Sequence, residues 1–286
     1  MKKSGKFLLV FLTALSMLCG VLGLVGCDQT KPVASSEGLK YRLLDDGTYH
    51  VSGLGSCKDT DIVIPATYIG KAVTGIAFKA FDGCSNIKSV STGDGVTTIN
   101  AFAFYGCSNL TSVILGNNVT KISHIAAFGC NKLSFNEYDE CKYLGTENNP
   151  YFALIDTKES GYTSYTIHKD TNIIADNAFD TTNRLVSIVI PDSVTRIGAR
   201  AFAGCKTLTS VVIGDSVTAI GERAFGDCTS LTSVYYKGTA SDWNNVTISL
   251  NNPYFTSATR YYYSEEAPIE AGDWWHYNEQ GEVVVW

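Results

Sequence analysis

The sequence predicts a solenoid, a right-handed superhelix of 23-residue coils that is mostly β-strand and turn with little helix, capped by β-hairpins. Two observations predict it. Two adjacent stretches of the chain are nearly identical at an offset of 23 residues, and apolar residues alternate with polar ones in each, as along a strand buried on one side. One such coil cannot bury a core alone, so stacked coils must cover each other's apolar faces.

The repeat is clearest in the second half of the chain. Residues 193–213 read SVTRIGARAFAGCKTLTSVVI, and residues 216–236 read SVTAIGERAFGDCTSLTSVYY. The frame recurs three times between residues 73 and 133 and once, in degenerate form, between 174 and 188, which makes six copies in two blocks. Alternation along the last strand of the first stretch points Val211 and Ile213 inward and Val212 outward.

This frame resembles the BspA-like leucine-rich-repeat family (the type 5 repeat), whose consensus is I-P-x-x-V-x-x-I-G-x-x-A-F-x-x-C-x-x-L. Residues 190–208 match it almost throughout, and the resemblance covers residues 61–248. Members are commonly bacterial surface proteins and some are adhesins, so the resemblance implies a binding role. Three residues depart from the frame: Ala127 in the Phe place, Thr182 in the Cys place, and Thr92 at an inward position.

The N-terminus predicts export and lipid attachment. Residues 1–6 are basic and residues 7–26 are uncharged, as in a signal peptide. Residues 24–27 resemble the lipobox of bacterial lipoproteins, in which the cysteine is acylated and becomes the new N-terminus. We therefore expect a lipoprotein with acyl chains such as palmitate on Cys27, anchored in the cell membrane and facing the extracytoplasmic cell surface. An uncleaved spanning helix and ordinary signal cleavage are the alternatives.

Net charge narrows the possible partners. The formal charge is −6, and removal of Lys2, Lys3 and Lys6 with the leader brings the mature chain to about −9. Binding of nucleic acid requires clustered cations, so no nucleic-acid partner is expected. Attraction to anionic lipid is excluded for the same reason, so any membrane attachment must be covalent or transmembrane.

The repeats divide the chain into eight segments. We expect a signal peptide (1–26), a flexible tether (27–38), an N-terminal β-hairpin cap (39–60), repeat block 1 (61–135), an irregular β insert (136–170), repeat block 2 (171–236), a C-terminal cap (237–264), and an acidic linker with a Trp-rich hairpin (265–286). Residues 45–48 mark the turn of the first hairpin. In the insert, residues 151–155 and 162–167 predict paired strands around Gly161. The insert is a candidate for binding or for a structural bridge between the blocks.

Reactive chemistry is sparse in this sequence. Five of the nine cysteines share one repeat position, where a buried thiol ladder is expected although coil spacing also allows disulfides: Cys84, Cys107, Cys130, Cys205 and Cys228. The four histidines have no metal-ligand spacing, and no phosphate-binding loop, dinucleotide fingerprint or nucleophile elbow is present. We therefore expect no catalytic residue, cofactor or metal, and no enzyme.

The outward strand positions predict a ligand surface for an extracellular protein or glycan. One column is uniformly serine, whereas the next varies and ends in an aromatic residue, so the ligand surface is assigned to that second column: Ile114, Val189, Val212 and Tyr235, with Lys237. The C-terminal tryptophans Trp274 and Trp275 are the candidates for stacking on sugar rings. The alternative is a small hairpin that buries its tryptophans against itself or the last coil.

Overall fold

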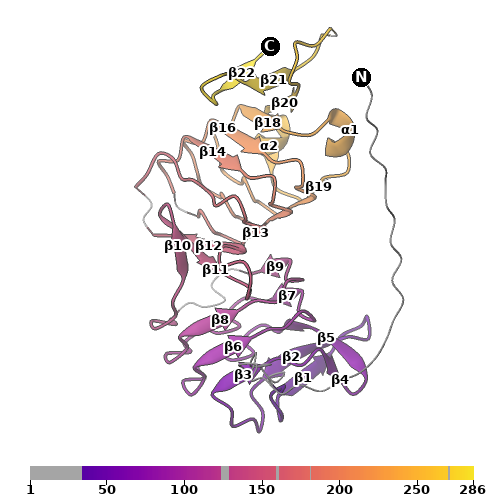
Figure 1. Cartoon of the computed structure of the whole chain (residues 1–286), viewed down its shortest axis with the longest axis vertical. Coiled ribbons are helices and arrows are strands. Elements are labelled where there is room, and N and C mark those ends of the chain that lie inside the picture. Colours follow the sequence, from indigo (N-terminus) through magenta and orange to yellow (C-terminus); the bar gives the residue numbers. More distant parts are fainter. Residues whose placement is uncertain (1–33, 124–128, 159–160, 181, 270) are drawn as a thin grey trace, which may run out of the picture. The chain divides into compact units, whose positions relative to one another are not determined.

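The computed structural model describes residues 34–123, 129–158, 161–180, 182–269 and 271–286, all within one compact unit. The chain winds through this unit as a β-solenoid with little helix, so the predicted fold class is confirmed (Figure 1). Paired residues of successive coils are 23 apart over most of its length, as in Ser187↔Ser210 and Ser210↔Ser233. The sequence repeat therefore corresponds to one turn of the solenoid.

One side of the coils carries a series of strands that we call the front ladder. In the first half these are β3 (Asp61–Val63), β6 (Ser89–Ser91) and β8 (Ser112–Ile114). In the second half they are β14 (Ser187–Ile190), β16 (Ser210–Ile213), β18 (Ser233–Tyr236), β20 (Thr259–Tyr263), β21 (Trp274–Tyr277) and β22 (Val283–Val285). Along β14 the side chains alternate as expected, because Ile188 and Ile190 are buried and Val189 is exposed.

The opposite side carries shorter strands, the back ladder. In order they are β2 (Tyr49–Gly53), β5 (Lys71–Ile76), β7 (Thr98–Ile99) and β9 (Lys121–Ile122), then β12 (Ala153–Thr157), β13 (Ile173–Ile174), β15 (Arg196–Ile197), β17 (Ala219–Ile220) and β19 (Thr247–Ile248). Successive strands within each of these two runs pair in parallel. Each coil thus presents two β-faces around one apolar interior.

A column of phenylalanine rings fills the turn that leads from the back ladder to the front ladder. Ring centroids are 4.8 Å apart for Phe179 and Phe202 and 5.1 Å apart for Phe202 and Phe225, with nearly parallel planes. Phe255, from helix α2 (Pro253–Ser257), extends the column at 4.5 Å from Phe225. All four phenylalanines are fully buried. The column therefore continues past the last repeat, although α2 lies outside the repeat frame.

The repeat cysteines are hydrogen-bond donors in this column. The thiols of Cys107 and Cys228 donate to the carbonyls of Phe81 and Phe202 in the preceding coil, at 3.0 and 3.1 Å. Thr182 replaces Cys in the degenerate copy, and its hydroxyl donates to Phe179 O at 2.7 Å. All seven cysteines among the described residues are free, which agrees with the thiol ladder and not with disulfides: Cys57, Cys84, Cys107, Cys130, Cys141, Cys205 and Cys228. Of the five ladder cysteines, Cys84 in the first coil is only partly buried, and the other four are buried as expected.

The N-terminal end is closed by the expected hairpin. Strand β1 (Lys40–Leu43) pairs antiparallel with β2, and Asp46 in the connecting turn accepts hydrogen bonds from the amide and hydroxyl of Thr48 at 2.9 and 2.8 Å. Strand β2 then continues the back ladder by pairing with β5. A second small hairpin joins β4 (Thr67–Tyr68) to β5.

The segment between the repeat blocks contributes to two cores. Strand β10 (Asn136–Tyr138) pairs with β11 (Cys141–Leu144), and β11 pairs with β12. Leu144 and Ala153 pack into the apolar cluster of the first block, whereas Tyr143 and Leu154 pack into that of the second. This arrangement favours the structural bridge over the binding insert.

One expectation for this segment is wrong. Residues 151–155 and 162–167 do not pair with each other, because β12 pairs with β11 and β13. Instead, Thr166 forms a parallel bridge with Val189, and the amide of Val186 donates to Thr163 O at 3.0 Å. Both contacts have the 23-residue offset, so the alternation that suggested a hairpin belongs to the solenoid frame. Tyr165 and Ile167 accordingly occupy the buried places of Ile188 and Ile190.

Candidate functional site: the outward face of the front ladder

The predicted ligand column lies on the outward face of the front ladder, but its members differ in exposure. Ile114 and Val189 are 40% and 49% exposed. Val212 is only 4% exposed, so its assignment to a ligand surface is wrong. Val212 pairs in register with Val189 on one neighbouring strand and with Tyr235 on the other, so it lies between these two side chains. Tyr235 and Lys237 are partly exposed.

Tyr235 belongs to an aromatic cluster that the sequence did not reveal. Tyr261 pairs with it in register and stacks on it, with ring centroids 5.0 Å apart and planes inclined by 20°. Tyr263 follows on the same face of β20, and Tyr277 lies on β21. We call Tyr235, Tyr261, Tyr263 and Tyr277 the tyrosine face. The offset between β18 and β20 is 26 residues, not 23, which is why a search in the repeat frame missed it.

Trp275 is the buried centre of this cluster. It has no exposed surface, and its indole N–H donates to Tyr236 O at 3.0 Å. Its ring meets the rings of Tyr235, Tyr263 and Tyr277 edge-on, with centroids 5.7, 5.1 and 4.9 Å away. The assignment of Trp275 to a sugar-stacking surface is therefore wrong, because neither face of its indole is accessible. Trp275 instead holds the tyrosine face in place.

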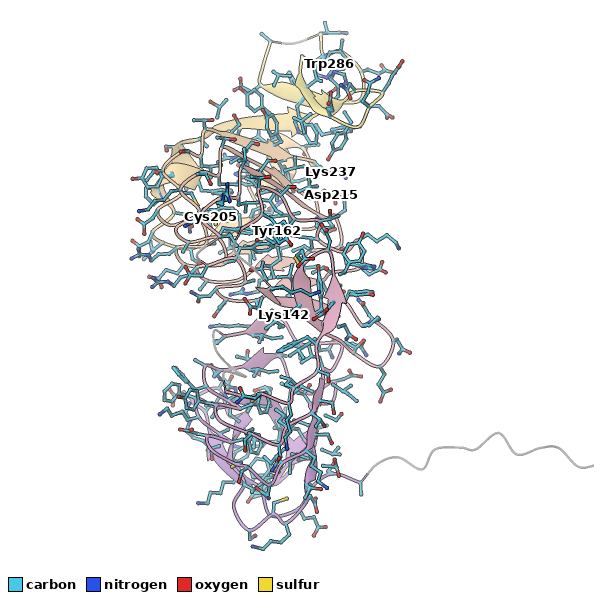
Figure 2. The ribbon with its side chains drawn as sticks, turned by 90° about the vertical axis from the view of Figure 1, so that its left-hand side faces the viewer. Lys142, Tyr162, Cys205, Asp215, Lys237 and Trp286 are labelled. Atoms are coloured by element: carbon cyan, nitrogen blue, oxygen red, sulfur yellow. The ribbon has the colours of Figure 1, made fainter. Side chains whose placement is uncertain are left out.

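Lys237 is committed to an ion pair within the protein. Its Nζ lies 2.5 Å from Asp192 Oδ2, two coils away. Burial acts to lower the pKa of Lys237, but the hydrogen bond and charge of Asp192 outweigh it, so the pKa is raised. Asp215 and Tyr277 add to the electrostatic environment of this ammonium group, and Asp215 is drawn beside Lys237 in Figure 2. The pair connects coils along the front ladder and neutralises the ammonium group of Lys237.

The orientation of the rings determines what this surface can bind. Tyr235 and Tyr261 stack on each other, so each covers one ring face of the other while both stay partly exposed. Burial raises the pKa of Tyr277, so its hydroxyl is neutral and can both donate and accept a hydrogen bond. Rigid tyrosines with apolar edges and hydroxyl groups are the residues that protein-recognition surfaces favour.

Trp274, the other predicted sugar-stacking residue, lies together with Trp286 on the opposite side of the β21–β22 hairpin. Trp286 is 46% exposed and stacks on His276, with centroids 3.9 Å apart and planes inclined by 18°. Its indole N–H donates to Ser264 O at 3.0 Å. Trp274 is half-buried, and its buried Nε1 has no hydrogen-bond partner. Trp286 thus presents an open ring face, which Trp275 does not.

A shallow pocket of about 140 Å³ lies further along the outward face. It is lined by Ser91 and Ile114 of the front ladder, by turn residues that include Asp94 and Asn117, and by Glu147 of the bridging segment. Thr92, the polar residue at an inward position, lies beneath it and accepts a hydrogen bond from Gly116 N at 2.8 Å. This contact explains how the hydroxyl is tolerated in the core.

The family model for the BspA type leucine rich repeat region matches residues 55–147 and 158–256, with six copies. These matches cover more than half of the chain. The chain belongs to this family. The BspA-type match ends at residue 256, so three members of the tyrosine face, together with Trp275, come from strands beyond the repeats. No curated protein matches the chain.

Several solved leucine-rich-repeat structures are similar to this chain. A leucine-rich-repeat protein of T. pallidum is 24% identical and aligns over 71% of this chain and 80% of its own, with a TM-score of 0.38. One from Bacteroides ovatus is 20% identical over 81% of this chain and 71% of its own, with a TM-score of 0.37. A leucine-rich cell surface protein from Faecalibacterium prausnitzii is 19% identical over 76% and 98%, with a TM-score of 0.28.

Two further expectations concern metals and the membrane. Within the part of the chain that the structure describes, no group of three or more His, Cys, Asp or Glu side chains is placed to hold a metal ion. None of the described helices has the length and apolar character needed to cross a bilayer. Cys27, the predicted site of lipid attachment, lies outside the described residues.

Proposed function

We propose that this chain is a non-enzymatic binding protein held at the extracytoplasmic surface of the cell membrane by lipid on Cys27. Its ligand is proposed to be a surface protein of a host or of another bacterium, bound on the tyrosine face. The observation that carries the proposal is the buried Trp275, which fixes several partly exposed tyrosines on one side of the front ladder.

The chemistry of this face supports binding and not catalysis. Lys237, which is close to this face, is paired with Asp192, and the tyrosines are held by stacking and edge contacts. Tyrosine loses little conformational entropy on binding and supplies both apolar contact and hydrogen bonds, so it is frequent among the residues that dominate interface energies. A fixed group of such residues can bind a protein surface without any reactive side chain.

A protein array probed with the soluble chain from Asp28 to Trp286 tests the proposal. We expect saturable binding to a surface protein, weakened about tenfold or more by Tyr261→Ala, because loss of a central tyrosine typically costs more than 1 kcal/mol of binding energy. Tyr138→Ala is the matched control, since Tyr138 is 40% exposed and lies on β10, away from this face. Equal effects of the two variants would exclude the tyrosine face, and the absence of saturable binding would contradict the function.

A second candidate function is glycan binding through the C-terminal aromatics. It is favoured by Trp286, whose ring is backed by His276 on one face and is 46% exposed. On a glycan array, Trp286→Ala should abolish binding, because stacking on a sugar ring requires an open aromatic face. The backbone amide of Trp286, which donates to Trp274 O at 3.1 Å, is unchanged by the substitution. Unaltered glycan binding by this variant would exclude the role.

A further inference from the structure

Strand β22 leaves one edge of the front ladder open. The amides of Asn278 and Trp286 donate to Glu282 O and Trp274 O, at 3.0 and 3.1 Å. Hydrogen-bonded pairs alternate along an antiparallel ladder, so Val284 faces β21 and the backbone groups of Val283 and Val285 point the other way. In the described residues nothing lies in register beyond β22, which ends its sheet. Two amides and two carbonyls therefore form an unused template for a further strand.

The strands at the other end of the ladders are protected against such pairing, whereas β22 is not. The edge strand β1 carries Lys40 and Arg42 and an irregular register at Lys40, and such charges and bulges block edge pairing. At β3, the edge is covered by Ser36, whose amide donates to Val63 O at 2.9 Å and whose Oγ accepts from Val63 N at 3.1 Å. Strand β22 consists of three valines and has no charge, proline or bulge of this kind.

The open edge is continuous with the tyrosine face. Val283 pairs with Tyr277 and Val285 pairs with Trp275, so both valines point to the side of the sheet that carries that face. Val285 is 44% exposed, and Val283 is partly exposed. A strand added at this edge would gain backbone hydrogen bonds from β22 and would place alternate side chains beside Val283, Val285 and the tyrosine face.

We propose that the edge of β22 binds an extended, apolar peptide segment of a protein partner as an additional strand of the front ladder. The inference rests on the proposed function and deepens it, because it names the form in which the partner is recognised. Backbone hydrogen bonds would give affinity, and the valines together with the tyrosine face would select β-branched or aromatic side chains at alternate positions.

Amide hydrogen exchange measured by NMR tests this in the Asp28–Trp286 chain, which retains the whole compact unit. The probes are short peptides in which valine or tyrosine alternates with threonine, added at millimolar concentration. We expect exchange at Val283 and Val285 to slow about fivefold or more, as for one added hydrogen bond each. The amides of Val284 and Trp286 should not change, since both already face β21.

Two controls test whether the slowing of exchange comes from hydrogen bonds at the edge of β22. Val283→Pro removes an edge donor that β21 does not use and should abolish the slowing at Val285, whereas Val284→Thr should preserve it. A peptide methylated at the amides that face β22 should have no effect on the wild type, whatever the fate of the proline variant. Absence of slowing with all alternating peptides overturns the proposal, as does slowing that appears in concentrated protein without peptide, which would assign the edge to a second copy. If array binding is lost in Tyr261→Ala but kept in Val283→Pro, strand addition fails while the proposed function stands.

Discussion

Replacing Cys27 by alanine is expected to abolish lipid modification of the protein completely. Two acyl chains anchor a protein stably where one would be marginal, and a mature chain near −9 has no electrostatic means of holding an anionic membrane. Intact mass should show the added acyl chains on the wild type and none on Cys27→Ala. On cell fractionation, the wild type should be found in the membrane fraction and the variant should be lost from it.

The matched control is Cys57→Ala, which alters a cysteine of the folded unit that is 4% exposed and forms no disulfide. It should remain acylated and in the membrane fraction. A wild type that carries no acyl chains, or a Cys27→Ala variant that is acylated all the same, would contradict the lipid anchor without affecting the solenoid or its tyrosine face.

Replacing Phe202 by alanine is expected to lower the free energy of unfolding by about 3–5 kcal/mol. The ring is fully buried between Phe179 and Phe225, so its loss leaves a cavity in the middle of the aromatic column. The coil also depends on its neighbours for stability, because each coil of a solenoid contacts only adjacent ones. Urea unfolding followed by circular dichroism measures the effect.

Phe78→Ala is the control for this substitution, since Phe78 is 59% exposed and lies at a coil turn of the first block. Surface substitutions of this kind usually change stability by about 0.5 kcal/mol or less. If Phe202→Ala were no more damaging than Phe78→Ala, the stacked rings would contribute little, and the interpretation of the column as the core of the second block would fail.

The 23-residue repeat is sufficient to predict most of the fold from the sequence. Residues that recur every 23 positions identify the coil, the phenylalanine position and the shared cysteine position, because stacked coils impose the same environment at the same place. The hydrogen bonds of the thiols were not predicted. The hairpin with its turn at residues 45–48 followed from local turn chemistry, and the expected Trp-rich hairpin is formed by β21 and β22. The pairing of residues 162–167 failed because short-range alternation is the same for a hairpin and for a strand of the solenoid.

The tyrosine face could not be predicted from the repeat, because part of it lies outside the 23-residue frame. Helices α1 (Ala240–Trp243) and α2 lengthen the last coil, so Tyr261 and Tyr263 leave the 23-residue frame and were not aligned with Tyr235. The burial of Val212 and Trp275 depends on which side chains from different strands meet at the surface. That is decided by tertiary register and not by the residue's own place in a strand.

The thiol column has a consequence for how this chain reaches its native state. Burial raises the pKa of Cys205 to about 11 and that of Cys228 to about 12, so once folded these sulfurs are almost wholly unreactive at neutral pH. If the chain folds in the extracytoplasmic compartment proposed for it, these thiols are exposed to oxidants before folding, and wrong disulfides would trap the chain. Biogenesis is then a kinetic competition between coil stacking and oxidation. Contacts between adjacent coils, which pair residues only 23 apart in a chain of 286, favour stacking.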